Sequence, residues 1–563
     1  MRSALLLLTT LLLAAGCSQQ PPESQAPAAA PTVPTSAKAA TRATPAAPTA
    51  AEADRIAAHV AFLSDDGLEG REAGTRGHEL AALYVSSQFA QAGLIPAGDD
   101  GSWLQTVPLL RGEMLREGSQ FVLEREGGNV ELQFEAEYLP NIGFNVPEWE
   151  VVAPLVYVGH GVVAPAFKHD DLAGVDVRGK IAIVVGGAPA RFEKDARALY
   201  SSNREKQTVL AERGAVGVVY IADPEREKNS PWARSAANWR RAGMRLRDAQ
   251  GAPVDTFPQL RGNVTLSVAA ATKLFAGTPQ SAEEVFRRLK AGEVQAFDLP
   301  GKARISGRAT LAPLSSVNVV GLLRGGDPVL GDEFVVYTAH LDHLGIGAEV
   351  DGDGIYNGAL DNALGSAVLM ETARLAAQLP RTARSQLFVA VTAEEKGLLG
   401  SDHFARNPGV AGRLVANLNM DMPVILSAQS DAITIGMEHS SLNAEVQAAA
   451  AELSIAITPD PFPEEVSFIR SDQFSFVRRG IPALSVKGGI TSTVAGVDAR
   501  QQLVDFRREH YHQPSDEIAL SIHYPTAARL ATLNLRMGQR IGSAAKAPAW
   551  SQGNFFGERF AKP

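Results

Sequence analysis

From Val317 onward, short apolar runs alternate with stretches in which apolar residues recur at helical spacing. The runs predict strands, and the spaced stretches predict helices. Apolar strands separated by helices are typical of a mostly parallel sheet that is covered on both faces. We therefore expect an α/β fold, with a mixed sheet between helices. The expected strands are Asn318–Leu323, Phe334–Ala339, Gln386–Val391, Val415–Asn419, Ala432–Ile435 and Ala483–Val486, and the expected helices are Ser366–Leu379, Leu442–Leu453 and Thr526–Ile541.

The chain before Val317 has a different character. Residues 52–95 predict a helix, a glycine-rich turn and a second helix, and residues 102–140 predict short strands. In residues 145–310, β-rich runs are punctuated by glycines, and one or two helices are expected. We interpret this stretch as a separate β-rich unit that precedes the alternating region.

The N-terminus has the pattern of a targeting segment. The apolar run Ala4–Ala15 is too short to span a bilayer as a helix. It ends in Leu13-Ala14-Ala15-Gly16-Cys17, which resembles a bacterial lipobox and implies a lipid on Cys17; a plain signal peptide with an incidental cysteine is the alternative. Ser18 resembles outer-membrane rather than inner-membrane sorting. Residues 17–50 are rich in Ala and Pro and predict a tether.

Composition narrows the possible functions. The 563 residues carry a formal net charge of −9, and no basic domain stands out, so nucleic-acid binding is not expected. Cys17 is the only cysteine, which excludes disulfides, cysteine-ligated zinc and a cysteine nucleophile from the folded part. The sequence has neither a Gly-x-Ser-x-Gly turn nor a His-Glu-x-x-His helix, which removes two common hydrolase classes.

Imidazole and carboxylate side chains gather where the predicted strands end. In an open parallel sheet, ligands bind beyond the carboxyl ends of the strands. Histidine and carboxylate are also the side chains that hold catalytic zinc. Three strand ends, one helix start and one later loop supply His340, Asp342, Glu394, Glu395, Asp421, Asp361 and His512.

Five of these ligands suffice for two zinc ions if one carboxylate bridges them. Two divalent ions balance three carboxylates and one shared hydroxide, and a further carboxylate can act as general base. Each residue also has a simpler interpretation. A single histidine can pack at a strand end, a Glu-Glu pair can be exposed, and Asp361-Asn362 can cap a helix.

Five motifs in order resemble the di-zinc aminopeptidases of family M28. They are His340-Leu341-Asp342-His343, Leu360-Asp361-Asn362, Ala393-Glu394-Glu395-Lys396-Gly397, Asn419-Met420-Asp421-Met422 and Tyr511-His512-Gln513-Pro514-Ser515-Asp516. Residues 155–185 and 211–221 resemble a protease-associated (PA) domain, which family members often carry as an insertion. The resemblance implies a zinc-exopeptidase fold in residues 51–144 and 311–545 and a PA-like insertion at 145–310. The N-terminal pattern and composition predict a signal peptide at 1–16 and a linker at 17–50, and residues 546–563 are expected to form a C-terminal tail.

The resemblance also implies a role for each motif residue. His340 and Asp421 would hold one zinc, Glu395 and His512 would hold the other, and Asp361 would bridge them. Glu394 would be the general base, and Asp342 would orient the His340 imidazole. Tyr511 matches a phenol that can hydrogen-bond the tetrahedral oxyanion, with plain packing as its alternative.

On this resemblance, the chain would be a secreted, membrane-anchored zinc aminopeptidase. It would hydrolyse N-terminal residues from peptides with a hydroxide held by two zinc ions. Its partners would be peptides and, through the lipid alone, a membrane on the periplasmic face of the cell envelope. A carboxypeptidase or a glutaminyl cyclase on the same fold, and a binding protein without catalysis, are the alternatives.

Three finer expectations complete the picture. The resemblance implies a non-proline cis bond between Asp361 and Asn362. Gln473 stands where relatives often have His, in a loop expected to line the substrate pocket. The remaining histidines are assigned to the surface or to packing, namely His343, His403, His439 and His510.

Overall fold

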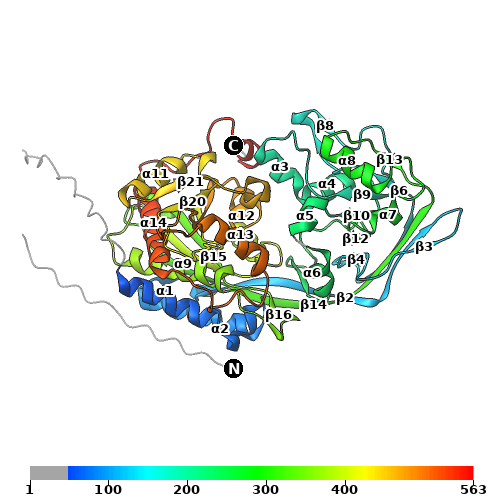
Figure 1. Ribbon diagram of the computed structural model, residues 1–563. Helices are drawn as coiled ribbons and strands as arrows, with labels where there is room; N and C mark the ends of the chain where they lie inside the picture. Colours follow the sequence, from blue (N-terminus) through cyan, green and yellow to red (C-terminus); the bar gives the residue numbers. More distant parts are fainter. Residues whose placement is uncertain (1–48, 230, 562–563) are drawn as a thin grey trace, which may run out of the picture. The chain divides into compact units, whose positions relative to one another are not determined.

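The computed structural model describes residues 49–229 and 231–561, which belong to one compact unit. A mixed sheet of twelve strands runs through it (Figure 1). Strands β18, β15, β19 and β22 are parallel to one another, whereas β14 is antiparallel to β18 and β20 is antiparallel to β22. The expected α/β fold with a mixed sheet is confirmed. The central strands, in spatial order, are β14 (Lys302–Leu323), β18 (Ser385–Val391), β15 (Glu333–His340), β19 (Arg413–Asn419), β22 (Ala483–Gly488) and β20 (Asp431–Ile435).

Helices cover both faces of this sheet because successive side chains of a strand point to opposite sides. Val335 and Tyr337 pack in one core, and Val336 packs in the other. The first core is closed by α1 (Ala50–Leu63), α2 (Arg76–Ala92), α9 (Leu364–Ala377), α11 (Leu442–Glu452) and α14 (Tyr524–Ser543). The second is closed by α10 (Leu399–Arg406), α12 (Gln473–Val477) and α15 (Phe555–Phe560). Residues 546–563, expected as a tail, therefore carry a packed helix, with Phe556 fully buried.

A second sheet of six strands lies in the stretch interpreted as a β-rich unit. It runs in the order β13 (Phe297–Asp298), β6 (Leu155–Tyr157), β9 (Ile181–Val185), β10 (Gly217–Ile221), β12 (Gly262–Leu266) and β4 (Tyr138–Pro140). Six helices accompany it rather than the one or two expected, namely α3 (Lys194–Ser201), α4 (Asn203–Glu212), α5 (Pro224–Asn229), α6 (Trp232–Ala237), α7 (Ala271–Leu274) and α8 (Ala282–Ala291). Four of them have eight residues or fewer, too short for a clear periodic signal. We term this sheet with α3–α8 the second lobe, and the rest the main lobe.

Two long strands connect the lobes (Figure 1). The short strands expected in residues 102–140 are mainly one 21-residue strand, β2 (Leu104–Glu124), which pairs antiparallel with the 22-residue β14 from Leu104↔Val319 to Glu124↔Lys302. One end of β14 contributes Ala303 and Ile305 to the core of the second lobe, while its other end pairs with β18. The expected boundary between residues 310 and 311 therefore falls inside β14.

Smaller strands complete the large sheet. Strand β11 (Gly243–Leu246) forms its outer edge by pairing with β2. The others are β1 (Ile95–Pro96), β3 (Val130–Glu131), β5 (Glu148–Ala153) and β21 (Ala456–Thr458), and two separate hairpins are formed by β7 (Val163–Ala164) with β8 (His169–Asp170) and by β16 (Gly345–Val350) with β17 (Asp353–Tyr356).

Cys17 and the tether up to residue 48 lie outside the described residues. Within residues 49–229 and 231–561, no helix combines the length and the apolar character needed to cross a membrane.

Candidate metal centre and active site

Three neighbouring parallel strands bring the predicted ligands together. β15 ends at His340, β18 leads into Glu394 and Glu395, and β19 leads into Asp421. Because β15 pairs with both β18 and β19 in parallel, the three carboxyl ends meet at one edge of the sheet. The expectation that these residues converge is confirmed.

Asp361 lies between two histidines. Its Oδ1 is 3.3 Å from His340 Nε2, and its Oδ2 is 3.3 Å from His512 Nε2. Asp421 Oδ1 lies 3.1 Å from the same His340 nitrogen, and Glu395 Oε2 lies 3.1 Å from the same His512 nitrogen. Each imidazole therefore faces two carboxylates, and the Asp361 carboxylate is common to both. One oxygen on each side is what a bridging carboxylate requires.

His343 also belongs to this cluster, so its assignment to surface or packing is wrong. It is fully buried, and its Nδ1 lies 2.8 Å from Glu395 Oε1. In the sequence, the position of His343 three residues after His340 could have indicated that it belongs to the cluster. The other unassigned histidines, His403, His439 and His510, are in neither of the groups that could hold a metal ion among the described residues.

The donor atoms fit metal ions. The ligand atoms of His340, Asp361 and Asp421 lie within 4.8 Å of one another, and so do those of His343, Asp361 and Glu395. His343 Nδ1 and Glu395 Oε1 lie 2.8 Å apart without a well-aligned hydrogen bond, and His343 Nε2 is buried with no hydrogen-bond partner among the described residues. Leaving buried polar atoms in this state is costly unless a cation satisfies them. Histidine with carboxylate is a ligand set that suits zinc.

Glu394 differs from its neighbour Glu395. Glu394 lines the cavity described below, whereas Glu395 points to His343 and His512. Burial, together with the facing carboxylates of Asp421 and Glu395, raises the pKa of Glu394 well above its usual range. A carboxyl group with a raised pKa is a stronger proton acceptor than an ordinary one, as a general base requires.

Asp342 supports the centre in a way that the sequence did not indicate. Its backbone carbonyl, not its carboxylate, lies 3.1 Å from His340 Nδ1. The carboxylate instead accepts hydrogen bonds from the backbone N–H groups of Glu394 (3.1 Å) and Glu395 (3.4 Å). Because the chain folds back between His340 and Asp342, the carbonyl reaches the imidazole first. Asp342 thus fixes both the histidine and the two glutamates.

Two further buried side chains hold the loops of the centre together. Asp516 accepts hydrogen bonds from the backbone N–H groups of Leu360 (2.9 Å) and Asp361 (3.0 Å), which joins the loop of His512 to that of Asp361. Asn362 donates to Met420 O (3.0 Å) and accepts from Met422 N (3.2 Å), which joins the loop of Asp361 to that of Asp421. The Asp361–Asn362 peptide bond is cis, as expected.

Arg71, in the connector before α2, binds three segments of the main lobe. Its guanidinium donates to the backbone carbonyls of Leu341 (2.9 Å), Asn357 (2.5 Å), Gly358 (3.2 Å) and Leu63. The connector can approach α2 so closely because Gly77 has no side chain; a Cβ there would lie 1.8 Å from Leu68 O. Sequence reasoning missed Arg71, since its partners are backbone atoms some 270 residues away.

The loop of Gln473 reaches the cavity, as expected, but Gln473 itself does not line it. It is buried behind Asp421, where it accepts from Asn419 Nδ2 (2.9 Å) and donates to Phe468 O (2.8 Å). Of its loop, Ser471 lines the cavity.

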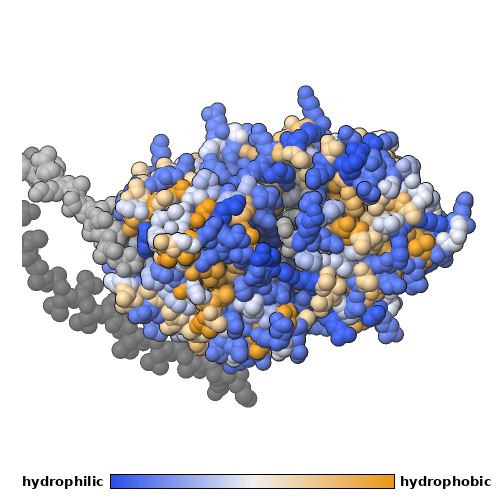
Figure 2. Space-filling model, in the orientation of Figure 1, coloured by the Kyte–Doolittle hydropathy of each residue, from blue (hydrophilic) through white to orange (hydrophobic). Residues whose placement is uncertain are grey.

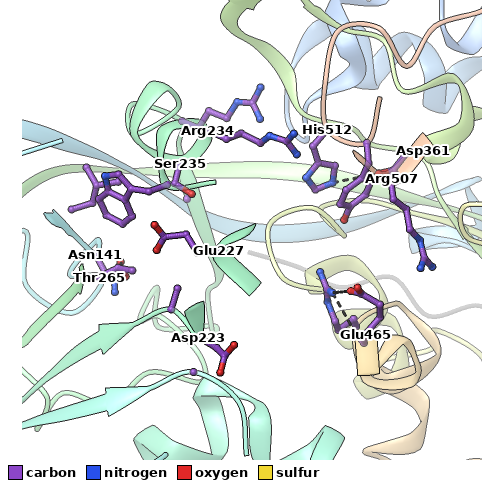
Figure 3. Close-up of a pocket in the computed structure, with 18 of the residues that line it drawn as sticks. Asn141, Asp223, Glu227, Arg234, Ser235, Thr265, Asp361, Glu465, Arg507 and His512 are labelled. Carbon is purple, nitrogen blue, oxygen red and sulfur yellow. Dashed lines mark hydrogen bonds and ion pairs between the residues drawn. The ribbon is translucent and has the colours of Figure 1, made fainter. Parts of the chain in front are cut away.

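A cavity of about 1050 Å3 opens onto the centre between the two lobes. Figure 2 shows its mouth as a hollow with mostly hydrophilic residues around it. His340, Asp361, Glu394 and Tyr511 line it from the main lobe, with Tyr511 stacked on His512 at 3.8 Å between ring centroids. Figure 3 shows Asn141, Asp223, Glu227 and Thr265 across the opening, in the second lobe.

Residues 318–537 match the model of peptidase family M28. All five candidate metal ligands and Glu394 lie inside the matched segment, so the family match and the geometry point to the same centre. The M28 match supports a metallopeptidase. The second lobe lies outside it.

A solved structure resembles this chain over most of its length, beyond the segment that the family model matches. An aminopeptidase from Aneurinibacillus sp. strain AM-1 is 20% identical, with 89% of this chain and 94% of that chain covered and a TM-score of 0.52. A zinc aminopeptidase from Bacillus subtilis is 18% identical, with 88% and 96% covered and a TM-score of 0.42. A glutaminyl cyclase from Porphyromonas gingivalis is 19% identical, with 40% and 78% covered and a TM-score of 0.30. At 20% identity, the likeness to the Aneurinibacillus aminopeptidase concerns the fold alone.

Proposed function

We propose that the protein is a zinc aminopeptidase that holds two zinc ions and removes N-terminal residues from peptides. The observation that carries the proposal is the Asp361 carboxylate, with one oxygen facing His340 and the other facing His512. Asp421 would complete the first site, and Glu395 would complete the second. His343 is a further nitrogen donor beside Glu395. Zinc bound there supplies Lewis-acid polarisation of the scissile carbonyl and a water of lowered pKa.

The side chains of the cavity would carry the proton transfers. Glu394 would accept a proton from the attacking water as the new C–O bond forms. It would then return that proton to the amide nitrogen, so that the C–N bond breaks and a neutral amine leaves. The Tyr511 hydroxyl, on the same cavity wall, would donate a hydrogen bond to the oxyanion.

The proposal includes a place for this reaction. The lipobox-like sequence at Cys17 supports a lipid anchor on the periplasmic face of the cell envelope, with the outer membrane favoured. Peptides would be the partners, and the membrane would be reached through the lipid.

Metal analysis combined with the variant Glu394→Gln tests the mechanism. The variant should bind two zinc ions per chain, like the wild type, yet lose roughly 10²–10⁴-fold in kcat/KM, the usual contribution of a general base. Glu349→Gln, the same change on the exposed hairpin β16, is the control and should keep full activity. Full turnover by zinc-loaded Glu394→Gln would remove Glu394 as the base.

A substrate panel tests the type of activity. The wild type should release the first residue from free-amine peptides and leave N-acetylated peptides intact. Cleavage of only the acetylated peptides would indicate a carboxypeptidase. Cyclisation of N-terminal glutamine without hydrolysis would indicate a glutaminyl cyclase.

A further inference from the structure

Arg241 reaches the candidate active site from the segment between α6 and β11, outside the M28 region. β11 pairs with β2 at the edge of the large sheet, which fixes the chain two residues after Arg241. The guanidinium lies over the Tyr356 ring at 4.0 Å. Gly347 makes room for it, because a Cβ at that position would lie 2.4 Å from Arg241 Nη2.

The segment before Arg241 is braced from both lobes. The Trp232 indole donates to Glu135 O (2.7 Å), and the Trp239 ring packs edge-on against Phe134 at 5.0 Å between centroids. From the main lobe, the backbone N–H of Ala348 donates to Asn238 Oδ1 (3.5 Å). Figure 3 shows Arg234 and Ser235 of α6 facing His512 and Asp361 across the cavity. The position of Arg241 is therefore set before any ligand binds.

The charge of Arg241 is only partly compensated, because Tyr356 is its main favourable neighbour and two of its donors make no well-aligned hydrogen bond. Its Nε and Nη2 atoms are buried and have no hydrogen-bond partner among the described residues. The nearby carboxylates of Glu395 and Glu72 are engaged elsewhere, Glu395 with His343 and His512, and Glu72 with Lys396 at 2.7 Å. An arginine stays charged in proteins, so burying these N–H groups without an acceptor is costly. Arg71, by contrast, satisfies its donors with carbonyls.

Arg241 is also one of the residues that line the cavity of Glu394, Asp361 and Tyr511, and it brings a fixed positive charge to that cavity. A planar fork of N–H donors matches the two oxygens of a carboxylate or a phosphate, and of these two groups a peptide supplies the carboxylate. A peptide with a free C-terminus carries a carboxylate on the leaving side of the scissile bond. In a dipeptide this carboxylate is only two bonds from the departing nitrogen.

We propose that Arg241 binds the C-terminal carboxylate of short peptides, and so makes the enzyme favour dipeptides with a free C-terminus. This inference rests on the proposed aminopeptidase function. It assigns the second lobe and its flanking segment a part in substrate selection, since Arg241 lies outside the residues that carry the zinc ligands. Arg241 would be a specificity residue and take no part in proton transfer.

Three substrates and three variants test the proposal. The substrates are Leu-Gly, Leu-Gly-amide and leucine p-nitroanilide, of which only the first has a carboxylate. Arg241→Met keeps the length of the side chain but removes the donors, and Arg241→Lys keeps the charge without the fork. Arg240→Met is the matched control, because the Arg240 guanidinium stacks on Trp239 at 5.1 Å and is absent from the lining of the cavity.

Arg241→Met should raise KM for Leu-Gly roughly 10–100-fold, the value of a charge-assisted pair of hydrogen bonds, with little change in kcat. Leu-Gly-amide and the nitroanilide should change less than about threefold. Arg241→Lys should lie between the wild type and Arg241→Met, and Arg240→Met should match the wild type.

Two outcomes overturn the proposal. An equal loss on all three substrates would make Arg241 a structural residue, and an unchanged KM for Leu-Gly would make it irrelevant to binding. If the wild type cleaves none of the substrates, the proposed function fails instead. In that case, calorimetry can still measure the affinity of zinc-loaded wild type and of Arg241→Met for Leu-Gly. Equal affinities would refute the contact between Arg241 and the carboxylate.

Discussion

Replacing Arg71 with Met should destabilise the main lobe and weaken zinc binding together. The change keeps an aliphatic stem but deletes every donor of a guanidinium that is 1% exposed. Four backbone carbonyls then lose a partner, those of Leu63, Leu341, Asn357 and Gly358. A buried acceptor left unsatisfied costs about 1–3 kcal/mol, so even the lower value predicts a loss of about 4 kcal/mol in the free energy of unfolding.

Two of these carbonyls belong to segments that carry candidate ligands. Leu341 follows His340, and Gly358 lies three residues before Asp361. Loosening both segments should weaken zinc affinity about 10–100-fold, as is typical when the supports of ligands are removed. Arg71 also faces the carboxylates of Asp342, Asp516 and Asp361, which raise its pKa against the effect of burial. Its loss therefore leaves these carboxylates less well compensated.

Urea unfolding of the zinc-free and zinc-loaded protein, together with zinc titration, measures both effects. Arg76→Met is the control, because Arg76 lies at the start of α2 and pairs with Glu79 at 3.1 Å on the exposed surface. Such pairs contribute little, so a change of at most about 0.5 kcal/mol is expected. A loss below about 1 kcal/mol for Arg71→Met, or a loss with unchanged zinc affinity, would refute the reasoning.

Two other predictions concern acid stability and the oxyanion. Burial lowers the pKa of His78 to about 3 from 6.5, so below pH 6.5 the unfolded chain binds a proton that the folded chain does not. The wild type should therefore lose about 1.4 kcal/mol more per pH unit than His78→Gln as pH falls from 6.5 to 4, and parallel urea curves for the two proteins would contradict this. Tyr511→Phe should lower kcat about 10²-fold at unchanged zinc content, and an unchanged kcat would leave Tyr511 with a packing role only.

The strands and helices of the alternating region were predictable because each is apolar in a regular period. Phe334–Ala339 and Gln386–Val391 lie within β15 and β18, and Leu442–Leu453 matches α11 to within one residue. The length of β2 and β14 was not predicted, although short strands in residues 102–140 and the strand Asn318–Leu323 were expected. Their middle parts have exposed residues on both faces, so the alternation is lost there.

The candidate ligands were predictable from their place at strand ends, but their supports were not. His343 gives the same local pattern whether it packs or binds a metal, and its partner Glu395 lies 52 residues away. Arg71, Asp342 and Arg241 act through backbone atoms or through unpaired donors, which leave no trace in residue spacing. Such contacts depend on the tertiary arrangement.

The ribbon of β2 and β14 has a consequence for how this protein can change. Both strands contribute side chains to the core of each lobe, so no pair of cuts in loops would release the second lobe as an intact module. Swapping it for another insertion requires a replacement that continues the same two backbones in register. Likewise, the cleft can widen only if the paired strands bend, because β2 and β14 run from one lobe into the other as a continuous pair. New substrate preferences would therefore come more readily by single replacements along the cleft than by exchange of the whole lobe.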